Sequence, residues 1–242
     1  MLWSESSFMN QSIHQLQQLI ASYTGKVLRE RFGKGPESVI VSMGGQYITI
    51  YLRNFLTPSE RVLLQQDHTH IVYQTRERLM ELVLPEVSAY IAQVTGSQPE
   101  EMYYDWALHH HSGMITAICL ETFTEEVDLN EQFDKKAELE QEIILISGQS
   151  RRNPEQLQSF EMNNRTLLFI REGILVPIEK EFIRLGHGEL LKSVKRNMEK
   201  QYLYQQGLFE PILNRRILDI FVDWDYDFNK SIIVMVTSPR SL

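Results

Sequence analysis

The stretch LTPSE at residues 56–60 returns at residues 175–179 as LVPIE, an offset of 119 residues. The leucine, the proline and the glutamate keep their places, and His68 returns as His187 at the same offset. Self-similarity at one constant interval indicates that the same structural unit occurs more than once in a chain. Two occurrences, rather than a longer series, predict a fused pair of similar domains.

A second landmark, Asp105-Trp106, returns as Asp223-Trp224 at an offset of 118 residues. Trp occurs only three times in the chain, so two Asp-Trp pairs in the same context support the duplication. The change of offset by one residue indicates a length difference in a loop. The sequence therefore predicts a first domain over residues 1–121 and a second, diverged domain over residues 122–242.

Each copy is predicted to begin with a helix and a hairpin. Apolar residues at helical spacing between Ser12 and Phe32 predict an amphipathic helix, which Gly33 ends. Two β-branched runs around Gly44-Gly45 predict a hairpin with a primed turn, because glycine tolerates a positive φ. Asn163-Asn164 occupies the same turn of the second copy and predicts the same positive φ.

A long helix is predicted to follow the hairpin. Thr57 and Glu60 have the spacing of a capping box and predict its start. This helix is expected to run to about Leu84, where Pro85 begins a shorter one. Val176 replaces the capping threonine in the second copy, and it has no side-chain oxygen with which to cap.

The complete element order is helix, hairpin, long helix, short helix and hairpin. The predicted segments are 12–32, 38–42, 47–52, 57–84, 85–94, 102–108 and 114–121 in the first copy, and 131–146, 156–162, 166–171, 176–204, 217–224 and 231–237 in the second, with an acidic linker at 121–128. The economical packing is an α+β fold in tandem duplication. Each copy is then a mostly antiparallel four-stranded sheet with helices packed on one face.

The composition excludes several classes of protein. A net charge of −8 at pH 7, shared between the halves, argues against nucleic-acid binding, which needs a basic face. No apolar run approaches the roughly 20 residues of a membrane span, and Met1 to Asn10 do not have the pattern of a signal peptide. The single cysteine, Cys119, fits a reducing compartment. We therefore expect a cytoplasmic protein, located in solution or at the inner face of the membrane, without direct insertion.

Several motifs carry a resemblance to a known family. They are VLRERFGKGP at residues 27–36, FLTPSE at residues 55–60 and VTG at residues 94–96. With them, residues 22–120 resemble the bacterial MpsC-type domain, named for a Na⁺-translocating membrane potential-generating system. GILVPIE at residues 173–179 extends the resemblance more weakly to the second copy. The resemblance implies a cytoplasmic domain that accompanies a membrane system for cation or inorganic-carbon transport. It brings no established catalytic residues.

Two further motifs have both a functional and a structural interpretation. His68-x-His70 and the run His109 to His111 could gather imidazoles around zinc. The second copy keeps only His187 of this set, so we expect solvent-exposed turn histidines and no metal site. The turn Gly33 to Pro36 resembles half of a phosphate loop, but it follows a helix, so the helix dipole is oriented wrongly for an anion.

The Asp-Trp pairs also leave two interpretations open. In the structural one, each Trp packs on its sheet and each Asp accepts hydrogen bonds from turn amides. In the functional one, Trp106 and Trp224 form an aromatic clamp for a ligand at the seam between the copies.

Two functional hypotheses follow. The first is a non-enzymatic accessory or sensor protein that binds a protein partner, such as a membrane transporter component, because no catalytic constellation recurs in both copies. Its first copy, with Lys34, is then expected to carry the contact. The alternative is an enzyme or a small-ligand-binding protein with a site in the cleft between the copies, built from His68, Tyr73 and Arg76 at helical spacing.

The candidate binding residues share polarity or aromaticity within these motifs, and no catalytic residue, metal ligand or cofactor is predicted. They are Lys34, His68, Tyr73, Arg76, Trp106, His187 and Trp224. A protein partner is expected and nucleic acid is not, and the formation of a homo-oligomer is left open.

Overall fold

The computed structural model describes residues 12–122, 130–149 and 152–239. Residues 1–11 and most of the predicted linker therefore lie outside the described part. The chain divides into two compact units, Met1–Met102 with Leu108–Asp128, and Tyr103–Ala107 with Leu129–Leu242. Tyr103–Ala107 belong to the first repeat by sequence but to the second compact unit by their contacts. The domain boundary at residue 121 stays a prediction.

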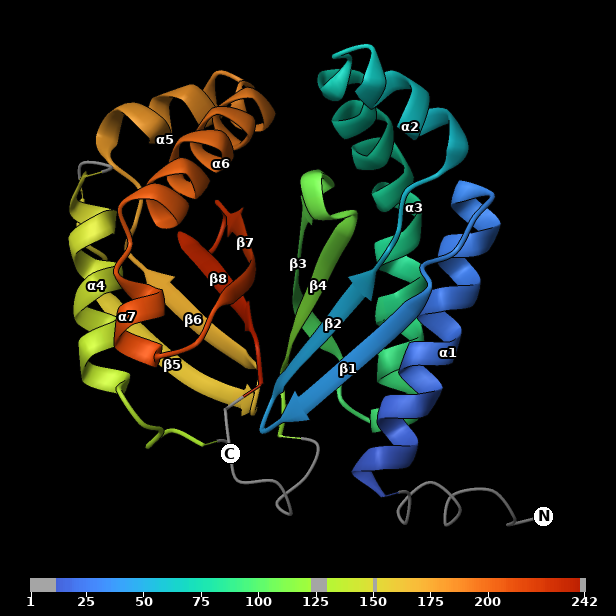
Figure 1. The fold of residues 1–242 in the computed structure, drawn as a ribbon, viewed down its shortest axis with the longest axis horizontal. Helices are drawn as coiled ribbons and strands as arrows, with labels where there is room; N and C mark the ends of the chain where they lie inside the picture. Colours follow the sequence, from blue (N-terminus) through green and yellow to red (C-terminus); the bar gives the residue numbers. More distant parts are fainter. Residues whose placement is uncertain (1–11, 123–129, 150–151, 240–242) are drawn as a thin grey trace. The chain divides into compact units, whose positions relative to one another are not determined.

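The first repeat places two long helices on one face of a four-stranded sheet (Figure 1). The long helices α1 and α3 pack against each other, and α1 contacts β1. The elements are α1 (Ile13–Phe32), β1 (Ser38–Gly44), β2 (Tyr47–Arg53), α2 (Pro58–Gln65), α3 (Thr69–Thr95), β3 (Pro99–Ala107), the short 3₁₀ helix η1 (Leu108–His110) and β4 (Ser112–Cys119).

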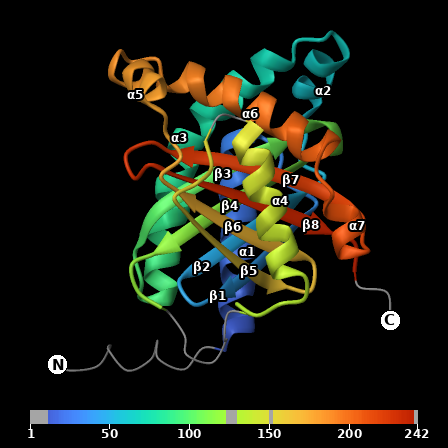
Figure 2. The same ribbon diagram turned by 90° about the vertical axis from the view of Figure 1, so that its left-hand side faces the viewer.

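The second repeat has the same order of strands and α-helices with one short helix added, and the described structure shows no counterpart of η1 in it. Helix α4 crosses the strands β5 and β6 (Figure 2), and α6 contacts β7. The elements are α4 (Lys136–Gln149), β5 (Gln156–Asn163), β6 (Thr166–Glu172), α5 (Pro177–Arg184), α6 (Gly188–Gln205), α7 (Phe209–Leu213), β7 (Ile217–Asp225) and β8 (Lys230–Thr237). The short helix α7 lies where the predicted element order has a short helix, between the long helix and the closing hairpin.

The two sheets have the same topology. Their strand orders are β1-β2-β4-β3 and β5-β6-β8-β7, and the described pairings are antiparallel. The register is equivalent as well, because Leu52 pairs with Gly113 in the first sheet and Arg171 pairs with Ser231 in the second. The predicted α+β tandem duplication is confirmed.

The predicted cap at Thr57 is confirmed. The Thr57 hydroxyl accepts the Glu60 N–H at 3.3 Å, and the Glu60 carboxylate accepts the Thr57 N–H at 2.8 Å. In the second repeat, only the carboxylate half remains, since Glu179 accepts the Val176 N–H at 3.2 Å and valine has no side-chain acceptor.

The predicted long helix is interrupted in both repeats, and the prediction of one continuous helix is wrong. After α2, Asp67 adopts a left-handed φ of 60°, and the His68 N–H bonds to the Leu63 carbonyl at 2.9 Å. After α5, Gly186 has φ 82°, and the His187 N–H bonds to the Phe182 carbonyl at 2.9 Å. These are Schellman motifs, which end a helix by satisfying its last carbonyls. The sequence signal was the glycine in the second copy, which an aspartate replaces in the first.

Pro85 lies inside α3, so the predicted break before it is also wrong. Proline cannot donate to the carbonyl four residues earlier, here that of Glu81. Both Pro85 and Glu81 are exposed, so water can hydrate this carbonyl. A proline on the solvent side of a long helix therefore leaves no buried polar group without a partner.

The two hairpin turns differ from each other. Gly45 has the expected positive φ of 56° in the turn between β1 and β2. Asn163 and Asn164 do not have a positive φ, so that prediction is wrong. Instead, the Asn163 side chain accepts the Arg165 N–H at 2.7 Å, and the β5–β6 register shifts between Glu161 and Asn163. An Asx turn and a bulge replace the left-handed residue.

The opening helix of the second repeat starts later than predicted, at Lys136 instead of residue 131. Phe133 lies before it and packs into the core instead. That core joins the inner faces of α4 and α6 to the sheet, with α7 at its edge. Its buried members are Phe133, Leu139, Ile143, Ile146, Leu167, Phe169, Ile174, Leu175, Leu203, Phe209, Leu213, Ile220, Val222, Trp224, Ile233 and Met235.

Candidate functional site

Lys34 makes a contact that recurs in both repeats. Its ammonium donates to the Leu56 carbonyl at 3.0 Å, and the side chain is half-buried. At the equivalent place of the second repeat, Arg152 donates to the Leu175 carbonyl at 2.8 Å. Each contact ties the loop after the first helix to the segment before the capped helix. The contact survives the sequence change in this loop, which indicates a structural role.

Arg76 and Glu60 form a buried ion pair behind the capping box. The Arg76 Nε donates to Glu60 Oε1 at 2.8 Å, and Nη2 donates to Glu60 Oε2 at 3.0 Å and to the Phe55 carbonyl at 2.8 Å. The second repeat keeps the pair as Lys195 and Glu179, also at 2.8 Å. Arg76 binds both oxygens of Glu60 through two N–H groups, whereas the Lys195 ammonium contacts one oxygen of Glu179.

The acid stability of the protein should depend on this pair. Burial alone would raise the pKa of the Glu60 carboxyl, but the hydrogen bonds and charge of Arg76 and the bonds to Thr57 lower it below 4.5. A lowered folded-state pKa contributes stability above the unfolded pKa, and this stability is lost as the pH falls through the folded pKa. The contribution is therefore complete at pH 7 and disappears in acid.

We expect Arg76→Met to lower the free energy of unfolding at pH 7 by about 3 kcal/mol, because it leaves the buried Glu60 carboxylate without its cation. We also expect the variant to lose less stability than the wild type between pH 7 and pH 3, because Glu60 no longer titrates with a lowered pKa. Urea unfolding at both pH values measures this. Arg78→Met on the same helix is the control, since the Arg78–Glu81 pair is exposed. An equal acid loss in the Arg76 variant and the wild type would contradict the prediction.

The predicted set His68, Tyr73 and Arg76 does not form one site. His68 is exposed at the corner between α2 and α3, whereas Arg76 is fully buried against Glu60. Tyr73 lies half-buried on α3 between them. His187 is likewise exposed at the corner between α5 and α6. The recurrence of the two histidines coincides with the Schellman motif, in which the backbone N–H of each closes the turn.

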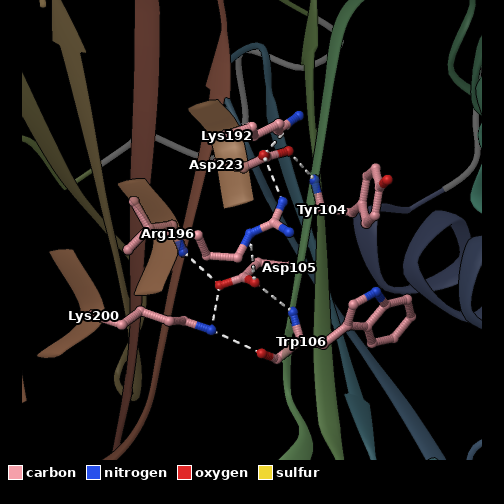
Figure 3. A network of polar contacts seen from close by, with 8 residues as sticks. Tyr104, Asp105, Trp106, Lys192, Arg196, Lys200 and Asp223 are labelled. Carbon is pink, nitrogen blue, oxygen red and sulfur yellow. Dashed lines mark hydrogen bonds and ion pairs between the residues drawn. The ribbon is translucent and has the colours of Figure 1, made fainter. Parts of the chain in front are cut away.

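The two Asp-Trp aspartates accept reciprocal backbone hydrogen bonds (Figure 3). The Asp105 Oδ2 accepts the Val222 N–H at 2.9 Å, and the Asp223 Oδ2 accepts the Tyr104 N–H at 2.8 Å. Both carboxylates are almost completely buried. The predicted acceptance from turn amides is therefore wrong for these residues. In the second repeat it is Asp225 that accepts turn amides, from Asp227 at 2.9 Å and Phe228 at 3.2 Å.

Three basic residues of α6 neutralise the two carboxylates (Figure 3). Lys192 lies 2.8 Å from Asp223, and Lys200 lies 2.5 Å from Asp105. Arg196 reaches both, at 3.2 Å from Asp105 and 3.3 Å from Asp223. Residues four apart share one side of a helix, so this spacing directs all three cations to one side of α6. The sequence signal that was overlooked is this basic ladder.

The ladder is specific to the second repeat. The equivalent positions of α3, at an offset of 119, hold Tyr73, Glu77 and Glu81. The network of two carboxylates and three cations therefore does not recur, although both aspartates do.

Arg196 is the most deeply buried cation of the network, and Lys200 exposes 13% of its side chain. Burial lowers the pKa of the Lys200 ammonium, while Asp105 opposes this shift by charge and by hydrogen bonding. Its Nζ also donates to the Trp106 carbonyl at 2.8 Å. The Lys200 ammonium thus contacts two acceptors within the protein, the Asp105 carboxylate and the Trp106 carbonyl. These contacts indicate a structural role for Lys200.

The two tryptophans are buried on their sheets. Trp106 and Trp224 expose 1% and 3% of their surface, so neither ring is open to a ligand as a clamp would require. Trp224 is part of the core of the second repeat, and the Lys195 ammonium lies 5.7 Å from its ring centroid. This is the cation–π geometry.

A second buried ion pair distinguishes the repeats. Arg171 of β6 pairs with Glu199 of α6, and both side chains are almost fully buried. The Arg171 Nε donates to the Ser231 hydroxyl at 2.9 Å, and Nη1 donates to the Ser147 hydroxyl at 3.0 Å. The overlooked sequence signal is an arginine in the otherwise apolar run of β6.

Neither the histidine turn nor Cys119 has an equivalent in the second repeat. His109 and His110 are exposed, and His111 accepts the Phe55 N–H through its carbonyl at 2.6 Å. Cys119 is buried, and burial raises the pKa of its thiol to about 11, opposed by a hydrogen bond with Ser97. Such a thiol is a weak nucleophile at neutral pH.

Comparison with known proteins identifies one family. The family model described as "Na+-translocating membrane potential-generating system (MpsC)" matches residues 12–121 and 132–238, one match in each repeat. Neither a curated protein nor a solved structure matches the chain. Among the described residues, no helix is long and apolar enough to cross a membrane.

Proposed function

The chain belongs to the MpsC family in both of its repeats, and from this premise we propose that it is a non-enzymatic accessory or sensor protein of a membrane cation-transport system. It acts in the cytoplasm by binding a protein component of that system. The link to transport comes from the family description alone, so it is an argument from the family and not from a site.

One observation supports the non-enzymatic part of the proposal. The polar contacts that recur in both repeats each have an internal partner in the described structure, either a backbone group or an opposite charge. Lys34 and Arg152 bind carbonyl oxygens, Glu60 and Glu179 bind buried cations, and Asp105 and Asp223 bind strand amides. Groups that hold the fold together in this way are not set up to act on a substrate.

The test is affinity capture with the full chain from detergent-solubilised native membranes. We expect an integral component of a cation transporter to be retained, and to be displaced by an excess of the free chain. Sodium flux in vesicles that contain the purified component should then change when the chain is added. Recovery of soluble proteins only, or an unchanged flux, would contradict the proposal.

The enzyme alternative has one favourable observation, the buried amine of Lys200. Its pKa is lowered by burial, as in lysines that act as bases or nucleophiles. If the protein is an enzyme of this kind, turnover of a small substrate should disappear in Lys200→Met while the fold persists. That result would replace the accessory role with catalysis.

A further inference from the structure

Helix α5 exposes an apolar face that no other described part of the chain covers. None of its residues is buried, yet three of its apolar side chains are spaced to share one side of the helix. Ile178 exposes 63% of its surface, Phe182 exposes 43%, and Leu185, directly after the helix, exposes 57%. A short helix with this pattern normally buries its apolar side against another surface.

Helix α6 also exposes apolar side chains, and in addition it buries charged ones. Leu190, Val194 and Met198 expose 61%, 55% and 36% of their surfaces. The charged residues of the same stretch point inward instead, and Lys195, Arg196 and Glu199 are buried. This reverses the usual distribution, in which a surface helix buries its apolar residues and exposes its charges.

From residue 190 onward, the exposed positions of α6 carry no charge, whereas Glu189 in its first turn is charged and exposed. Within α6, all of which the structure describes, the exposed positions from residue 190 onward are Leu190, Ser193, Val194, Asn197, Met198, Gln201, Tyr204 and Gln205. Serine, asparagine and glutamine side chains can both donate and accept hydrogen bonds. Such a surface is complementary to itself.

The helices α5 and α6 contact each other, and we call the set Ile178, Phe182, Leu185, Leu190, Val194 and Met198 the α5–α6 apolar face. These side chains together expose on the order of 600 Å², the upper end for a patch on a typical monomer. With the neutral polar residues beside them, the surface approaches the roughly 800 Å² per partner of a stable interface.

Three of the six positions of the face are apolar only in the second repeat, since Leu63, Ile71 and Leu79 of the first repeat are equivalent to Phe182, Leu190 and Met198. At three of its positions, the first repeat has the exposed polar residues Ser59, Gln66 and Thr75 in place of Ile178, Leu185 and Val194. The repeats share one topology, so the fold alone does not require apolar residues there.

We propose that the α5–α6 apolar face binds the same face of a second copy of this chain. The net charge of −8 repels a second copy wherever charged surfaces meet, and the exposed positions of α6 from residue 190 onward are uncharged. A two-fold dimer brings one patch against itself, which suits an apolar stripe with neutral amides. A lipid surface is disfavoured for α6, because its exposed positions from residue 190 onward include no lysine or arginine, which interfacial helices use to bind anionic lipid. The proposal does not depend on the transport role, since it concerns the purified chain alone.

The first test is sedimentation velocity of the full chain over a series of concentrations. We expect a monomer–dimer equilibrium in the wild type. Val194→Glu should weaken it by at least about tenfold, because dimerisation would bury the new charge. The matched control is Thr75→Glu, the same charge at the equivalent exposed position of the first repeat, which should dimerise as the wild type does. Circular dichroism checks that each variant is folded.

The second test is cysteine cross-linking, which is possible because the single native cysteine is buried. Cys119 is buried, so Val194→Cys adds one accessible thiol. A short bismaleimide should cross-link this variant into dimers and leave Thr75→Cys monomeric. A wild type that stays monomeric throughout, or dimers that persist in Val194→Glu, would overturn the proposal. Flotation with phosphatidylglycerol vesicles that depends on Val194 in a monomeric wild type would assign the face to lipid instead.

Discussion

Arg171→Leu is expected to lower the free energy of unfolding by about 4 kcal/mol, as breaking a buried ion pair from one side does. The substitution leaves the Glu199 carboxylate buried without its cation, and it removes the arginine donor to the Ser147 and Ser231 hydroxyls. Urea unfolding at pH 7 followed by circular dichroism measures the loss. Arg184→Leu is the control, because its pair with Glu181 is exposed and worth less than about 1 kcal/mol.

The first repeat shows how this loss can be reversed. At the positions equivalent to Arg171 and Glu199 it has Leu52 and Met80, which are both fully buried. The double variant Arg171→Leu/Glu199→Met places the apolar residues of the first repeat at both positions. Its free energy of unfolding should return to within about 1 kcal/mol of the wild type, because replacing both partners of a buried ion pair is often neutral. If the double variant is as unstable as Arg171→Leu, the uncompensated carboxylate is not the cause of the loss.

Asp105→Ala is expected to cost about 4 kcal/mol as well, for the opposite reason. It removes the carboxylate that faces Lys200 and Arg196, so two cations lose an anion inside a packed structure. It also leaves the Val222 N–H without its acceptor. Urea unfolding again measures the change.

Asp225→Ala is the matched control for Asp105→Ala. Asp225 lies on the next turn and caps it with two backbone hydrogen bonds, so its loss should cost about 1 kcal/mol. Combining Asp105→Ala with Lys200→Met should recover part of the stability, because the buried ammonium is removed together with its partner. A loss at Asp105 no greater than at Asp225 would show that the network contributes little.

The element order was predictable because it depends on local chemistry. The Thr57 capping box, the left-handed glycine at residue 33 and the β-branched strands act over a few residues, and each was found where the sequence placed it. The errors were local as well. Asp67 takes a left-handed conformation more often associated with glycine, and Pro85 is tolerated because its side of α3 faces solvent.

The candidate site was less predictable, because the chemistry of a side chain does not reveal its partner. Arg76 suggested a titrating group near His68, yet it binds a glutamate sixteen positions earlier in the chain. Asp105 suggested a turn acceptor, yet it bonds to a strand amide 117 positions away. The ladder of Lys192, Arg196 and Lys200 was visible as spacing, but on a typical helix such charges face water.

The sequence by itself determined the duplication, the α+β class and the family, because repetition and periodicity survive without knowledge of contacts. Only the tertiary structure decided which side of α6 faces inward. Burial there follows from the two carboxylates that the chain brings together. The free energy cost of a buried, unpaired carboxylate is larger than the cost of leaving an apolar side chain exposed to water. The free energy of pairing Asp105 and Asp223 therefore turns the charges of α6 inward and leaves Leu190, Val194 and Met198 exposed.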